Sequence, residues 1–134
     1  MIGRWHGLVL DCPAPRELAG FYQQLLGMDR VIWDTESWVS IEGSTGGPNV
    51  SFQQVSDFRA PQWPDPSWPQ QMHMDVMVSD LDAAEPLVLA LGGKLLDGSD
   101  KPIGYRVYAD PIGHPFCLVT PESIMSDPSE VHPA

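Results

Sequence analysis

The residues of this sequence that could do chemistry are a few histidines, cysteines and carboxylates in strand-like segments. The stretch ADPIGHPFCLV places His114 three residues before Cys117. A cysteine becomes a nucleophile when a nearby base or cation stabilises its thiolate. In an extended strand, however, side chains three residues apart point to opposite faces. We therefore expect no Cys–His dyad here, and we assign His114 to a turn whose geometry Asp110 and Gly113 set.

A carboxylate accompanies a second histidine in the segment HMDVMV, which begins at His73. Strand alternation predicts that Asp75 points to the same side as His73. A carboxylate in that place could act as a catalytic base, replace a metal ligand or support one by hydrogen bonding. Alternatively, the end of the strand is solvated and Asp75 is a surface charge. The residues alone leave both interpretations open.

An internal repeat indicates which elements position these residues. Two segments, beginning at His6 and His73, each run through a strand-like pattern and a turn into an amphipathic helix that stops at glycine. The histidines lie 67 residues apart, whereas the helix-ending Gly27 and Gly92 lie 65 apart. VSFQQV lies 64 residues before HPFCLV. The repeat predicts two modules of the same β-α-β-β-β order.

Local signals place the helices and strands of each module. The first helix begins at Pro15, which suits a first turn, and ends at Gly27, which favours a left-handed stop. In the second helix, Asp82 and Glu85 form a plausible capping pair, and Pro86 leaves the position of the start open. Short strands are expected at residues 30–34, 37–42 and 50–55 and at residues 94–96, 105–109 and 116–120.

We expect the modules to form one domain, because a half of about 60 residues rarely holds a core alone. Module one covers about residues 4–58, the connection 59–71, module two about 72–121, and a polar tail with His132 follows at 122–134. The connection RAPQWPDPSWPQQ reads as a stiff polyproline-like segment whose tryptophans pack over the sheet. The alternative is a proline-rich ligand for a recognition domain.

Composition excludes several classes of function. The 134 residues carry 18 acidic and 7 basic side chains, and the net charge of −11 disfavours nucleic acid and anionic membranes as partners. No apolar run is long enough for a membrane span, and the start of the chain does not resemble a secretory signal. Two cysteines are too few for a disulfide scaffold, so we expect a cytoplasmic protein with reduced thiols, although a single bridge stays open. Motifs for nucleotide cofactors are missing.

Three segments together resemble the vicinal oxygen chelate superfamily. They are FYQQLLGM at the end of the first helix, HMDVMVSDLDAA at the start of the second module and YADPIGHPFCLV at its end. This superfamily contains glyoxalase I, the bleomycin and fosfomycin resistance proteins and extradiol dioxygenases, and the sequence is most similar to its glyoxalase-like branch. The resemblance implies an α+β fold in which two βαβββ modules form a half-open barrel around a cavity. It also makes a homodimer plausible.

The resemblance implies a set of metal ligands. Metal-dependent relatives direct ligands inward from the first and last strands of each module, which by position gives His6 and His73, and Gln53 and Cys117. Such a set could hold a divalent ion such as Zn, Ni, Fe or Mn. Relatives usually place a carboxylate where this chain has Gln53 or Cys117. A buried cysteine is also most often a small hydrophobic residue.

Aromatic side chains surround the expected cavity. We expect Trp33, Trp38, Tyr105 and Tyr108 to form a pocket for a planar or apolar small molecule, although packing alone would explain many of them. The resemblance implies a glyoxalase-like protein with metal-dependent lyase, isomerase or dioxygenase chemistry. The alternative is a non-catalytic protein that sequesters an aromatic compound, as bleomycin resistance proteins do.

Overall fold

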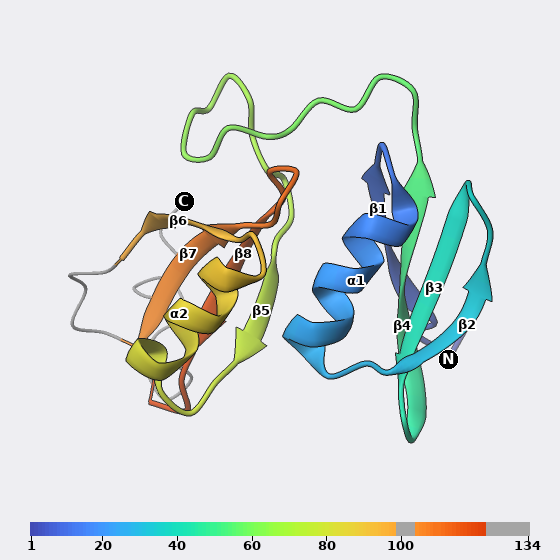
Figure 1. Cartoon of the computed structure of the whole chain (residues 1–134), viewed down its shortest axis with the longest axis horizontal. Coiled ribbons are helices and arrows are strands. Elements are labelled where there is room, and N and C mark those ends of the chain that lie inside the picture. The colour runs from blue at the N-terminus through green and yellow to red at the C-terminus, as the bar shows by residue number, and fades with distance from the viewer. Residues whose placement is uncertain (99–103, 123–134) are drawn as a thin grey trace. The chain divides into compact units, whose positions relative to one another are not determined.

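A computed structural model describes residues 1–98 and 104–122 of the chain, so the expected tail with His132 and most of the turn at residues 98–104 lie outside the described residues. The chain divides into two compact units, which we describe separately (Figure 1). Unit 1 covers Met1–Arg59, and unit 2 begins at Ala60 and includes the proline-rich connection. No helix in the described part is long and apolar enough to cross a membrane.

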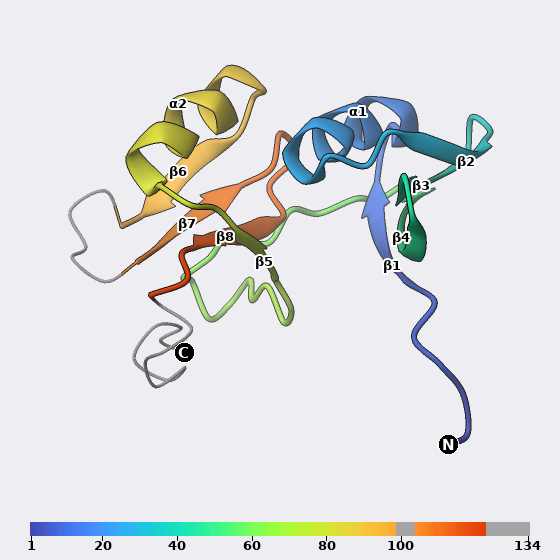
Figure 2. The ribbon, with the colours of Figure 1, turned by 90° about the horizontal axis from the view of Figure 1, so that it is seen from below.

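Unit 1 is a four-stranded sheet with one helix. Its elements are β1 (Gly7–Cys12), α1 (Pro15–Leu26), β2 (Arg30–Asp34), β3 (Trp38–Gly43) and β4 (Gly46–Gln54). The strands lie in the order β1-β4-β3-β2. β1 runs parallel to β4, and the other neighbours are antiparallel. Figure 2 shows α1 lying over one face of this sheet.

The first helix forms where the sequence predicts it. Pro15 occupies the first helical turn, and Gly27 ends the helix in the left-handed conformation with φ 65°. Tyr22 is buried and packs on Phe52 of β4, with ring centroids 5.6 Å apart. Both faces of β3 and β4 are buried at their centre, because apolar residues such as Val39 and Phe52 lie beneath α1 while the serines that alternate with them face the opposite side.

Unit 2 repeats the same topology. Its elements are β5 (Met74–Met77), α2 (Leu81–Ala90), β6 (Lys94–Asp97), β7 (Tyr105–Ala109) and β8 (Pro115–Val119). The strand order is β5-β8-β7-β6, with β5 and β8 parallel. The α+β class and the repeated βαβββ order are thus confirmed. The pairing of the modules into a half-open barrel stays a prediction.

The start of α2 differs from the expected capping pair. Asp80 is the N-cap, and its side chain accepts a hydrogen bond from the backbone N–H of Ala83 at 3.2 Å. Asp82 and Glu85 lie inside the helix, where both face Arg106 of β7. The prediction was wrong because Asp80 satisfies the helix N-terminus, which releases the two carboxylates for the sheet. Pro86 lies inside the helix.

The proline-rich connection packs back on unit 2. Trp63 contacts the buried cluster formed by Tyr105, Val107, Cys117 and Val119. Backbone hydrogen bonds from Gln62 to Trp68 and from Trp68 to Asp65 fold the segment into a turn. The expectation that tryptophans of the connection cover the sheet is confirmed for Trp63, whereas Trp68 is exposed.

Candidate functional site

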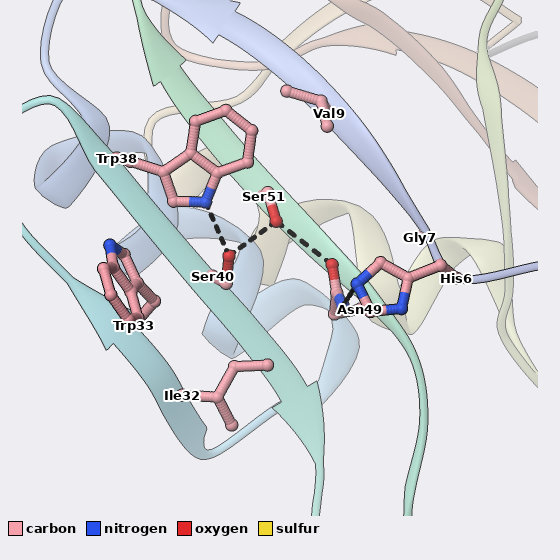
Figure 3. A pocket seen from close by; sticks show the side chains of 9 residues that line it. All are labelled: His6, Gly7, Val9, Ile32, Trp33, Trp38, Ser40, Asn49 and Ser51. Carbon is pink, nitrogen blue, oxygen red and sulfur yellow. Dashed lines mark hydrogen bonds between the residues drawn. The ribbon is translucent and has the colours of Figure 1, made fainter.

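A cleft opens on the face of the unit 1 sheet opposite α1. Its volume is about 460 Å³. The centre of the cleft lies over one row of paired residues that crosses all four strands, formed by Val9, Ser51, Ser40 and Trp33. Figure 3 shows the nine lining residues, which are His6, Gly7, Val9, Ile32, Trp33, Trp38, Ser40, Asn49 and Ser51.

A chain of hydrogen bonds forms the floor of the cleft (Figure 3). The indole N–H of Trp38 donates to Ser40 Oγ at 2.8 Å, and Ser40 Oγ lies 2.6 Å from Ser51 Oγ. Ser51 donates to Asn49 Oδ1 at 3.0 Å, so the proton between the two serines comes from Ser40. Asn49 Nδ2 lies 3.2 Å from His6 Nε2.

The donors and acceptors of these hydrogen bonds determine the tautomer of His6. An amide nitrogen donates only, so His6 Nε2 must accept the hydrogen bond from Asn49, and the ring proton of the neutral imidazole is on Nδ1. Ser40, Asn49 and Ser51 are all buried and mutually bonded. The floor is therefore a satisfied polar network that keeps its geometry without a ligand.

The walls of the cleft are apolar and open to solvent. Trp33 is 60% exposed, while Val9 and Ile32 are 45% and 41% exposed. None of the nine lining residues, all of which the structure describes, is Asp, Glu, Lys or Arg. Large exposed apolar surfaces around a polar floor are typical of a small-molecule site.

A second cluster of reactive groups lies in unit 2. His73, Asp75 and Cys117 each offer a donor atom, and these atoms all lie within 4.8 Å of one another. His73 Nε2 is 3.2 Å from Asp75 Oδ1. Asp75 and Cys117 are directly opposite each other in the β5–β8 pair, which explains why their side chains share a face.

The donors of this cluster fit a divalent metal ion. Imidazole nitrogen, carboxylate oxygen and thiolate sulfur are ligands that Zn²⁺ and Fe²⁺ accept, and three protein ligands leave a further position open. Burial, assisted by the charge of Asp75, raises the pKa of the Cys117 thiol to about 12. A metal must therefore displace the thiol proton, which makes binding stronger as the pH rises.

Strand register shows which positions of the two units correspond. Asp11 pairs with Gln53 in unit 1 as Asp75 pairs with Cys117 in unit 2. By this register, Val9 holds the position of His73 in unit 1, and His6 lies just before β1. The expected match between the two histidines does not hold. The 64-residue offset of the last strands, applied to the first strands, could have revealed this.

The other predicted ligand in unit 1 lies apart from His6. Gln53 is an exposed residue of β4, and its backbone carbonyl accepts a hydrogen bond from the Cys12 thiol. His6 bonds instead to Asn49, which precedes Gln53 by four residues, or roughly 13 Å, along the strand. The structure therefore brings His73 and Cys117 together with Asp75, and it does not bring His6 to Gln53.

The predicted pocket aromatics lie in three different surroundings. Trp33 and Trp38 line the cleft of unit 1. Tyr105 is in the buried cluster beneath Trp63. Tyr108 faces α2, where it stacks on Phe116 with centroids 5.7 Å apart and donates a hydrogen bond to Glu85 at 2.9 Å. Tyr108 therefore belongs to the packing between sheet and helix.

The sequence interpretation missed the polar floor. Ser40 and Ser51 stand among apolar residues in VSI and VSF on two predicted strands, of which β4 begins at Gly46 rather than at residue 50 and therefore also contains Asn49. A serine between apolar neighbours in a strand faces away from the core, so both could have been assigned to the open face. Asn49 is two residues before Ser51, and alternation would have placed it there too.

Comparison with known proteins agrees with this fold. The family model described as a glyoxalase-like domain matches residues 7–119. A glyoxalase/bleomycin resistance protein/dioxygenase family enzyme from Burkholderia phytofirmans PsJN is 14% identical, with a TM-score of 0.64 over 84% of this chain and 94% of that chain. A search of curated proteins finds no match.

Two further solved structures of similar fold belong to proteins that bind small molecules. A mutant of the fosfomycin resistance protein FosX from Listeria monocytogenes, complexed with Mn(II) and 1S,2S-dihydroxypropylphosphonic acid, is 14% identical (TM-score 0.65; 89% of this chain, 90% of that chain). TnmS3, an antibiotic binding protein from Streptomyces sp. CB03234, is 19% identical (TM-score 0.52; 90% and 99%). At these identities the likeness shows the fold. Together with the family model, it shows that this chain belongs to the glyoxalase-like domain family of the vicinal oxygen chelate superfamily.

Proposed function

We propose that this protein binds a small organic molecule in the cleft of unit 1. The observation that carries the proposal is the cleft itself, which combines two tryptophans with a floor whose polar groups are already bonded to one another. A preorganised floor loses little conformational entropy when a ligand binds. The description of TnmS3 as an antibiotic binding protein supports a binding role for this fold.

Calorimetry with small planar aromatic compounds, beginning with acridine and naphthol, tests this proposal. Trp33→Ala removes an exposed ring of the cleft, and we expect it to weaken binding by about tenfold or more. Trp68→Ala is the matched control, because Trp68 lies in the connection of unit 2 and should leave affinity unchanged. Binding that survives in Trp33→Ala, or that Trp68→Ala removes, would place the ligand elsewhere.

Metal-dependent lyase, isomerase or dioxygenase chemistry is the second candidate function. The convergence of donor atoms from His73, Asp75 and Cys117 favours it. A bound divalent ion would polarise a carbonyl group or a pair of vicinal oxygens as a Lewis acid. Asp75 lies beside His73, where it can orient the imidazole or accept a proton from a bound molecule. The Mn(II) in the FosX structure supports metal use in this fold.

Titration with Zn²⁺, Fe²⁺, Ni²⁺ and Mn²⁺ distinguishes the two candidates. We expect one tight site per chain for Zn²⁺ or Fe²⁺, lost in His73→Ala and in Cys117→Ala but kept in His114→Ala. His114 is a suitable control because its backbone bonds belong to the turn at Asp110. A protein that binds acridine in the cleft and no metal at this cluster would favour the binding function and contradict the metal-dependent one.

The proposal also covers the location, the partners and the oligomeric state of the protein. The net charge of −11 and the two buried thiols are consistent with a cytoplasmic protein that acts on a small molecule without nucleic acid or membrane partners. A homodimer is expected from the resemblance to the superfamily. Light scattering of the purified protein tests the oligomeric state.

A further inference from the structure

We infer that the cleft of unit 1 selects an aromatic ligand without negative charge and rejects anionic analogues of the same shape. This inference rests on the proposed binding function and adds the chemical class of the ligand. It starts from the lining, in which none of the nine described residues carries a formal charge when His6 is neutral. An anion placed among them would lose hydration without gaining a cationic partner.

Four hydrogen-bond donors of the floor are already engaged, and only the second N–H of Asn49 and the Nδ1–H of His6 are left without an acceptor among the lining residues. Trp38 donates to Ser40, Ser51 donates to Asn49, and Asn49 donates to His6. An oxyanion is stabilised by several donors directed at it, as in an oxyanion hole. Donors that are committed to a row of buried side chains cannot turn to a ligand without breaking that row.

The charges around the cleft act in the same direction. On β2, Arg30 is paired with Glu42 at 2.9 Å, so its charge is balanced. Asp11 follows Val9 by two residues on β1, so it lies on the same face of the sheet as the cleft. With a net charge of −11, the chain as a whole also repels anions. A phosphonate such as the one in the FosX structure would find no cation among these lining residues.

Matched pairs of amides and carboxylates test the inference. Naphthamide and naphthoate, and indole-acetamide and indole-acetate, differ little in shape and differ in charge at neutral pH. We expect each amide to bind at least about tenfold more tightly than its carboxylate in calorimetry. Equal or tighter binding of the carboxylates would overturn the inference while leaving the binding function intact. Failure of all four compounds, together with acridine and naphthol, would count against the binding function itself.

A charge introduced into the cleft gives the converse test. Val9 is an exposed lining residue, so Val9→Lys adds an ammonium group without burying it. We expect Val9→Lys to raise the ratio of naphthoate affinity to naphthamide affinity by up to about fivefold, the upper end of the range for an exposed ion pair, because any change in packing at Val9 affects both compounds. Val9→Gln, which is similar in length and uncharged, should not raise this ratio. If Val9→Lys does not fold, Ile32→Lys on the edge strand β2 serves the same purpose. A ratio that stays unchanged in a folded lysine variant would contradict the inference.

Discussion

Burial beside a carboxylate determines the chemistry of two side chains on opposite faces of the unit 2 sheet. Cys117 faces Asp75, and its thiol has a pKa raised to about 12, mainly by burial. Tyr108 faces α2, where burial, together with the hydrogen bond to Glu85, raises the pKa of its hydroxyl well above the usual value. Both groups are therefore protonated at neutral pH, and only a metal ion would convert Cys117 into a ligand.

The raised pKa of Tyr108 predicts a loss of stability in alkali. The folded state holds the phenol proton more tightly than the unfolded chain, so this contribution is complete below about pH 10 and is lost as the pH rises further. The free energy of unfolding should fall more steeply for wild type than for Tyr108→Phe, by at most about 1.4 kcal/mol per pH unit. Urea denaturation between about pH 9 and pH 11 measures both slopes. Parallel slopes would contradict the prediction, and the constant cost of losing the hydroxyl cancels in the comparison.

At the scale of elements, α2 depends on polar contacts to stay on its sheet. Val88 is the one fully buried residue of this helix, all of which the structure describes. Arg106 of β7 is 7% exposed and binds Asp82 at 2.6 Å and Glu85 at 3.5 Å. Glu85 also accepts the hydrogen bond from Tyr108. This carboxylate therefore joins the helix to two neighbouring positions of one strand.

Loss of Glu85 should consequently destabilise the protein. Glu85→Ala leaves the buried Arg106 with Asp82 alone and removes the acceptor of Tyr108, and we expect a loss of about 1–3 kcal/mol in the free energy of unfolding. Asp34→Ala is the matched control. It breaks the ion pair between Arg16 and Asp34, whose side chains are 61% and 55% exposed respectively. We expect it to lower the free energy of unfolding by less than about 1 kcal/mol. Urea denaturation measures both variants, and a control that costs as much as Glu85→Ala would refute this account of α2.

The same elements show what the sequence could predict. Periodicity, Pro15 and Gly27 located α1, and alternation placed Asp75 beside His73, at 3.2 Å. The match between the two histidines failed because it aligned the segments on the histidines themselves, 67 residues apart, whereas the paired strands repeat at an offset of 64 residues. Counted from equivalent strand positions, the loop before α2 is two residues longer than that before α1. In a strand such a shift changes the register, and an odd shift reverses the face of every side chain.

Tertiary contacts between distant segments were beyond sequence reasoning. Nothing in the pattern of the proline-rich connection specifies that Trp63, rather than Trp68, packs on the cluster of Cys117. The partners of Arg106 were equally hidden, because Asp82 and Glu85 fit a capping pattern as well as an ion pair. Local rules predict elements and faces, whereas the choice between two acceptable partners is made by packing.

At the scale of the whole molecule, two units of one topology carry different chemistry. The open face of unit 1 has a cleft lined by two tryptophans and by no Asp, Glu, Lys or Arg, while the equivalent strand face of unit 2 has the cluster of His73, Asp75 and Cys117 beside residues that Trp63 covers. The substitutions responsible are few. Gln53 stands where Cys117 stands, and Val9 stands where His73 stands. The two units therefore share a topology, and the side chains at equivalent strand positions differ.

The excess of acidic side chains is the property that both units share, and it predicts how salt affects stability. Acidic residues outnumber basic ones by 18 to 7, and Arg16, Arg30 and Arg106 already pair with carboxylates, so most of the negative charge is not balanced by basic side chains. Added salt shortens the screening length from about 30 Å at low ionic strength to about 8 Å at physiological ionic strength. Self-repulsion in the compact state then weakens, and the urea midpoint should rise with NaCl.

A variant with less negative charge provides the control for this effect. Asp29 and Asp57 are exposed, so Asp29→Asn combined with Asp57→Asn reduces the charge excess without disturbing the core. We expect this double variant to be more stable than wild type at low salt and to gain less from added NaCl, because less repulsion remains to be screened. KCl should act as NaCl does, which separates screening from binding of a particular ion. A urea midpoint that falls with salt would contradict this prediction, because it would mean that the ion pairs stabilise the folded chain by more than the repulsion between carboxylates destabilises it.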